Sequence, residues 1–119
     1  MAVAEKELRS IGYMAELIGE LRRQPEKIAE AMEKILTQQR VSDEAKERLH
    51  DKEGSLLQSG VIDGKNAEIR SAQLRDLTRE ERTKVRDCAE ILETLKIELK
   101  HEQDKFSAFK AIAQMLGGE

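Results

Sequence analysis

Two Glu-x-x-His pairs are the residues of this chain whose spacing could bind a metal ion. Glu47 with His50 and Glu98 with His101 include both histidines of the 119-residue sequence. On a helix, residues three apart share a face, and this is the ligand spacing of di-metal sites in ferritin-like bundles. Glutamate is abundant here, so chance matches are expected and neighbouring surface side chains are the favoured interpretation. We expect no metal and no cofactor, and an intersubunit metal site is the alternative.

Four arginines form a second candidate site. They recur at steps of four, three and four: Arg75, Arg79, Arg82 and Arg86. We call them the arginine stripe, because on one helix they would form a basic surface able to contact nucleic-acid phosphates. The net charge of −3 argues against a general nucleic-acid coat, and no aromatic residue interleaves with the stripe for base stacking. We favour ion pairing with carboxylates of a neighbouring helix.

Cys88 is the only cysteine, which excludes an intrachain disulfide and indicates a reducing compartment. It occupies an apolar helical position, so a buried thiol is favoured over a nucleophile assisted by His50. The segment Asp63-Gly64-Lys65-Asn66 has turn composition but lacks the glycine spacing of a phosphate-binding loop. We therefore expect a protein that is not an enzyme.

A long helix over residues 79–116 is expected to position most of these residues. Thr78 and Glu81 fit a capping box at its start, and Gly117-Gly118 follows its end. Its seam steps alternately by three and four residues: Val85, Cys88, Leu92, Leu95, Leu99, Glu102, Phe106, Phe109, Ala113 and Leu116. Only Glu102 is polar. This heptad pattern is typical of a coiled coil and requires a covering helix.

The last four seam residues, Phe106, Phe109, Ala113 and Leu116, make an apolar end. If the first helix of the chain covers them, they belong to the core. If it does not, they are an interaction surface. We favour the core and keep the interaction surface as the alternative.

Helices are also expected over residues 3–23, 25–58 and 67–77. The first has apolar residues at helical spacing: Leu8, Ile11, Met14, Ala15, Ile18 and Leu21. Pro25 suits the start of the second helix, which either continues past Ser42 or breaks there at a new N-cap, and we favour continuation. Asn66 caps the short third helix.

The similar lengths of helices 25–58 and 79–116 predict a long antiparallel, coiled-coil-like hairpin in one all-α domain. The short helix 67–77 makes the connection, and an additional N-terminal helix over 3–23 packs alongside. Matching the helix ends places Ile28 beside Ala113 and His50 near residue 89. The two Glu-x-x-His pairs then lie roughly 18 Å apart along the helices and cannot share one metal cluster.

Composition agrees with long helices. Charged residues make up 38% of the chain and aromatic residues only 3%, which suits extended helices better than a compact globule. No apolar run approaches the ~18–20 residues of a membrane span, and the N-terminus lacks the pattern of a signal peptide. We expect a cytoplasmic protein without membrane contact.

Residues 62–74, Ile-Asp-Gly-Lys-Asn-Ala-Glu-Ile-Arg-Ser-Ala-Gln-Leu, followed by Leu95-Lys96-Ile97-Glu98-Leu99-Lys100, resemble small helical proteins encoded by bacteriophages and prophages. The resemblance covers about half of the chain. It implies a phage-infected bacterial cell as the setting and supplies no catalytic residues. Some proteins of this kind belong with phage replication or recombination.

These observations predict a non-enzymatic helical interaction protein of phage or prophage origin, acting as a homo-oligomer or through a protein partner. The alternative is a nucleic-acid-associated accessory factor of replication or recombination that uses the arginine stripe. A more distant alternative is an oligomeric metal-binding protein that uses the Glu-x-x-His pairs.

Overall fold

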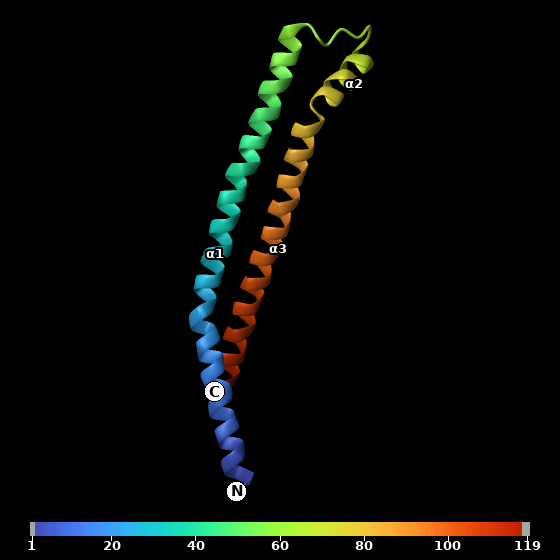
Figure 1. The fold of residues 1–119 in the computed structure, drawn as a ribbon. Coiled ribbons are helices and arrows are strands. Elements are labelled where there is room, and N and C mark those ends of the chain that lie inside the picture. The colour runs from blue at the N-terminus through green and yellow to red at the C-terminus, as the bar shows by residue number, and fades with distance from the viewer. Residues whose placement is uncertain (1, 118–119) are drawn as a thin grey trace. The chain divides into compact units, whose positions relative to one another are not determined.

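The computed structural model describes the backbone of residues 2–117 and side chains from residue 5 onward. Within this range the regular elements are helices, shown in Figure 1: α1 (Ala2–Ser59), α2 (Ala67–Leu77) and α3 (Arg79–Leu116). The described residues contain no strand. The predicted all-α fold, with two long helices joined through a short one, is confirmed.

α1 passes through Pro25 and Ser42 without ending. The predicted boundary at Pro25 is therefore wrong, and residues 3–23 do not form a separate helix. Proline in a helix interior removes a backbone donor and costs ~3 kcal/mol. Contacts with α3 on the N-terminal side of Pro25 offset this cost, because Leu17 is buried beside Phe109 and Gln24 is bonded to Glu102.

The segment that joins α1 to α2 is held by α2 itself. Gly60, with φ at 80°, takes the left-handed conformation that ends α1. Asn66 caps α2 as predicted, accepting a 2.9 Å hydrogen bond from the Ile69 backbone. The Gly64 backbone N–H donates to Gln73, and a β-carbon at Gly64 would lie 2.5 Å from Ile69. Only glycine fits this close approach.

Thr78 lies fully buried between α2 and α3. Its hydroxyl donates to the Leu74 carbonyl at 2.7 Å and accepts from the Arg82 side chain at 2.9 Å. The carboxylate of Glu81 accepts from Lys52 instead of completing a capping box with Thr78. The predicted helix boundary is confirmed, but the predicted capping box is wrong.

The chain forms two compact units. Unit 1 comprises Met1–Lys34 and Lys96–Glu119, and unit 2 comprises Ile35–Leu95. Within each unit, the segments of α1 and α3 run antiparallel. The α3 seam is buried or half-buried from Val85 to Ala113, while Leu116 is exposed.

In unit 1, Leu17 lies beside Phe109 and Ile112, and Gln24 contacts Glu102. The predicted pairing of Ile28 with Ala113 is therefore wrong. That prediction started the covering helix at Pro25. Because α1 begins well before Pro25, its residues ahead of the proline cover the end of α3.

In unit 2, Ala45, Cys88 and Leu92 are the buried apolar side chains. Gln38 donates a 3.3 Å hydrogen bond to the Cys88 carbonyl, so the predicted position of His50 at the level of residue 89 is also wrong. Lys52 bonds to Glu81 at 2.7 Å, which joins α1 to the first turns of α3.

Candidate functional site

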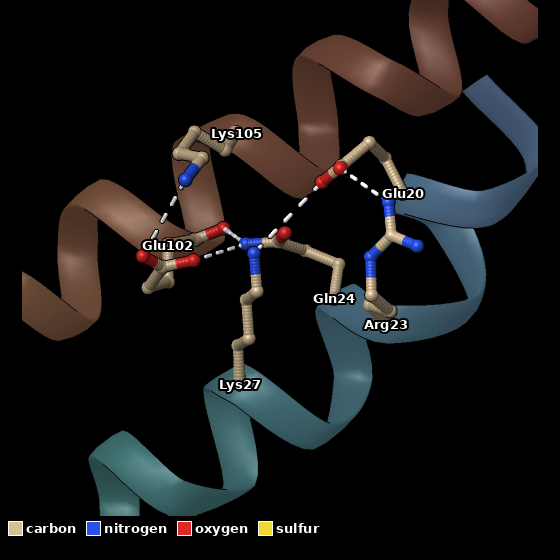
Figure 2. A network of polar contacts seen from close by, with 6 residues as sticks. All are labelled: Glu20, Arg23, Gln24, Lys27, Glu102 and Lys105. Carbon is tan, nitrogen blue, oxygen red and sulfur yellow. Dashed lines mark hydrogen bonds and ion pairs between the residues drawn. The ribbon is translucent and has the colours of Figure 1, made fainter. Parts of the chain in front are cut away.

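A buried polar layer joins α1 and α3 in unit 1. Gln24 has 0% of its surface exposed, and its side-chain amide donates to both the backbone carbonyl and the Oε2 atom of Glu102, at 2.9 and 2.5 Å. Figure 2 shows the two side chains meeting between the helices. Both amide hydrogens are used, because the two atoms that face them are acceptors.

Charged side chains surround this layer (Figure 2). The Lys105 ammonium nitrogen lies 3.6 Å from the Oε1 atom of Glu102. On α1, Arg23 and Lys27 form ion pairs with Glu20. The hydrogen bond from Gln24 lowers the pKa of Glu102, burial opposes that shift, and Lys105 and Lys27 add to it. Arg23 lowers the pKa of Glu20, chiefly through its hydrogen bond. Both carboxylates are therefore ionised at neutral pH.

The layer is built to select an alignment of the two helices. Gln24 Oε1 is buried and has no hydrogen-bond partner among the described residues. An unsatisfied buried acceptor costs ~1–3 kcal/mol, so the layer gains less stability than an apolar contact would. A buried polar residue at a coiled-coil seam favours the register that satisfies it. The geometry therefore suits positioning better than acid–base chemistry.

Sequence reasoning missed Gln24 by placing it at a helix boundary. The signal was present in the spacing of the covered face of α1 in unit 1, which steps by four, three, four and three: Leu17, Leu21, Gln24, Ile28 and Ala31. Gln24 falls on a seam position, as Glu102 does on α3. Two polar residues on facing seams could have been paired from the sequence.

The arginine stripe is divided between two environments. Arg82 is half-buried and pairs with Glu53 of α1 at 3.5 Å, as the ion-pair interpretation expects. Arg79 is exposed and pairs with Asp76, three residues before it. Arg75 and Arg86 are exposed, with no ion pair in the described part of the chain. The structure thus leaves three of the four arginines on the surface.

Both Glu-x-x-His pairs are exposed. Glu47 and His50 lie on α1 in unit 2, whereas Glu98 and His101 lie on α3 in unit 1. Glu98 and His101 border a shallow hollow with Lys27, Lys34 and other side chains of unit 1. Across residues 5–117, no three His, Cys, Asp or Glu side chains are grouped closely enough to hold a metal ion.

Cys88 is buried in unit 2 and carries a free thiol. His50 is exposed, and it lies twelve residues along α1 from Gln38, whose side-chain amide donates to the backbone carbonyl of Cys88. The Cys88 thiol therefore lacks the histidine partner that nucleophilic activation would need.

The predicted apolar end of α3 is only partly covered. Phe109 borders a hollow with Tyr13 and Leu17 of α1, and the Lys110 ammonium lies 4.7 Å from the Phe106 ring centre. Phe106, Phe109 and Ala113 are half-buried. Leu116 remains exposed.

α1 carries a second apolar face in unit 1 that no described residue covers. We call it the open stripe: Leu8, Ile11, Ala15, Ile18, Ala29 and Met32, all exposed. Leu8 and Ile11 have 68% and 64% of their surfaces exposed. The sequence predicted that most of these residues need a covering partner. In the structure, α3 instead covers another side of α1 in unit 1, which includes the polar Gln24.

None of the described helices combines the length and apolarity needed to cross a membrane. No protein-family model, curated protein or solved structure matches the sequence.

Proposed function

We propose that this protein is a non-enzymatic helical interaction protein that acts by self-association or through a protein partner. The observation that carries the proposal is the open stripe. Fully burying one Leu, Ile or Met side chain contributes ~1.5–3 kcal/mol, so covering several of them would strongly favour association. Leu8, Ile11, Ala15 and Ile18 follow one another on one face of α1, and contiguous exposed apolar surface of this kind marks protein interaction sites.

The small core supports the same proposal. Among the described residues, the buried apolar side chains are Leu17, Ala45, Cys88 and Leu92. Single hydrophobic cores of small domains supply little net stability, and oligomerisation is one common remedy. A second layer of helix packed on α1 would add the missing burial.

Sedimentation analysis of the wild-type protein and of a variant with charges on the open stripe tests this function. Replacing Ile11 and Ile18 with aspartate places two charges on the stripe and should convert an oligomer to a monomer without loss of helicity. The control variant carries Ser107→Asp and Ala111→Asp, at exposed positions of α3 in the same unit. A wild-type protein that stays monomeric, with stability unaffected by the stripe substitutions, would contradict self-association.

The resemblance of residues 62–74 to phage and prophage proteins motivates the proposed setting, a phage-infected bacterium. Affinity purification of the full chain from infected cells should recover a partner that the stripe variant loses and the α3 control variant retains. Equal recovery with both variants would count against the stripe as the binding surface.

A second candidate function is that of a nucleic-acid-associated accessory factor. The observation that favours it is the exposure of Arg75, Arg79 and Arg86. Phosphate contacts by exposed arginines release counterions, so such binding weakens as salt rises. The chain's net charge of −3 predicts that any affinity is low.

This second candidate is tested by replacing Arg75, Arg79 and Arg86 with glutamate. Arg82 is left unchanged because it bonds to Thr78 and Glu53. If the arginines contact phosphates, the variant should keep its thermal stability, lose DNA binding and lose the salt dependence of that binding. Unchanged DNA affinity at two salt concentrations would reject this function.

A further inference from the structure

The open stripe belongs to a second heptad pattern on α1. With Arg22 and Pro25 included, its positions step by three, four, three, four, three, four and three: Leu8, Ile11, Ala15, Ile18, Arg22, Pro25, Ala29 and Met32. All eight residues are exposed. This alternation matches that of the α3 seam, which is covered by α1. A heptad stripe sustained over seven steps is the geometry of a helix contact.

We propose that the occupant of the open stripe is the same stripe of a second copy, packed antiparallel. This inference rests on the proposed function and identifies the partner. An isologous two-fold contact uses the same surface patch on both subunits, and the open stripe of each copy meets this requirement. In the register whose two-fold axis passes between Arg22 and Pro25, Ala15 faces Met32 of the second copy, and Ile18 faces Ala29 of the second copy. At these two levels a large residue meets a small one.

Charge complementarity selects this orientation. In the antiparallel register, Arg22 faces Pro25 of the second copy, so its guanidinium lies next to Glu26 of that copy. The two-fold axis repeats the pair on the other side. Arg22 and Glu26 are both exposed, and neither has an ion pair within the described chain. Parallel pairing would instead place Arg22 against Arg22, and like charges in contact are repulsive.

A charge exchange tests the proposed pair. Arg22→Glu alone, or Glu26→Arg alone, places like charges together twice per dimer and should raise the dissociation constant roughly tenfold or more. The double variant R22E/E26R restores both pairs and should return the constant to near the wild-type value. The control Arg9→Glu makes the same charge change on α1 away from the stripe and should have little effect. Circular dichroism confirms that each variant stays helical.

Disulfide trapping tests the orientation. In a Cys88→Ala background, one sample carries Ala15→Cys and a second carries Met32→Cys. Oxidation of the mixture should form a cross-linked dimer of the two different chains, while each chain alone should cross-link poorly. The two positions lie roughly 25 Å apart along one helix, so a bond within one chain is excluded.

The outcomes separate this inference from the function on which it rests. Cross-linking of the Ala15→Cys chain with itself, or single charge variants that dimerise like the wild type, would overturn the antiparallel pairing and leave self-association intact. A wild-type protein that sediments as a monomer at every concentration would overturn both the pairing and self-association.

Discussion

Units 1 and 2 use the same two helices, yet different chemistry holds each pair together. Unit 2 buries three apolar side chains, Ala45, Cys88 and Leu92, together with the polar Ser42 and Thr78. It also carries ion pairs between α1 and α3, Lys52 with Glu81 and Arg82 with Glu53. Among the described residues of unit 1, Leu17 is the buried apolar side chain, and the amide of Gln24 lies against Glu102. The difference separates two physical roles, because apolar burial supplies stability while a buried polar contact favours one register.

The largest expected effect is in unit 2. Leu92→Ala should destabilise the protein by ~2–5 kcal/mol, because truncating a buried leucine removes its burial and leaves a cavity. Leu95 and Leu99 are half-buried, so their truncation should cost less. Ile97, which is 68% exposed, provides the control, and its replacement by alanine should change stability little. Chemical denaturation measures all four, and equal midpoints for Leu92→Ala and Ile97→Ala would contradict the described core.

The next effect tests the polar layer of unit 1. Gln24→Leu should destabilise by ~1–3 kcal/mol, because the Glu102 carboxylate loses its amide donor in a partly buried site. Adding Glu102→Leu removes the whole polar pair and should recover the wild-type midpoint or exceed it, as replacement of buried polar pairs by apolar residues often does. A double variant that is less stable than Gln24→Leu would show that the layer contributes net stability.

A smaller effect is expected for the ion pair of unit 2. Arg82 and Glu53 lie 3.5 Å apart with both side chains partly exposed, and exposed pairs contribute ~0–1 kcal/mol. Arg82→Ala should therefore lower the unfolding free energy by less than Gln24→Leu does. Thr78 loses a hydrogen bond in the same variant, so Glu53→Gln measures the ion pair alone. A large loss in Glu53→Gln would show that ion pairing dominates unit 2.

The smallest expected effect is on the loss of thermal stability at acidic pH. The pKa of Glu102 lies below its ordinary value of 4.5 in the folded protein, first because Gln24 donates to it. A carboxyl with a lowered folded pKa stabilises the fold fully above its unfolded pKa, and this contribution disappears as pH falls through the folded pKa. Glu102→Gln should therefore reduce the loss of thermal stability below about pH 4.5. The pKa values of Glu20 and Glu81 are also lowered. Part of the loss of thermal stability in acid therefore remains in both the wild-type protein and the variant.

The parts of the fold that could be predicted are those with local signals. The 79–116 helix was predictable because all but one of its seam residues are apolar. The start of α2 was predictable because Asn66 is a strong N-cap. α1 was harder to predict because its covered face includes Gln24, Gln38 and Ser42. Polar residues at seam positions interrupt the apolar heptad pattern, and a proline such as Pro25 is typical of the first position of a helix.

The sequence by itself determined that the chain is helical, that α3 needs a covering helix, and that the apolar residues of segment 3–23 recur at helical spacing. Spacing and composition carry this information because helical periodicity is local. The tertiary structure decided which face of α1 meets α3, since that choice depends on contacts between residues far apart in the chain. Gln24 with Glu102 in unit 1 and Gln38 with Cys88 in unit 2 show the result. The face of α1 that contacts α3 leaves Ile11 and Ile18 exposed to solvent, although their hydrophobicity alone would favour burial.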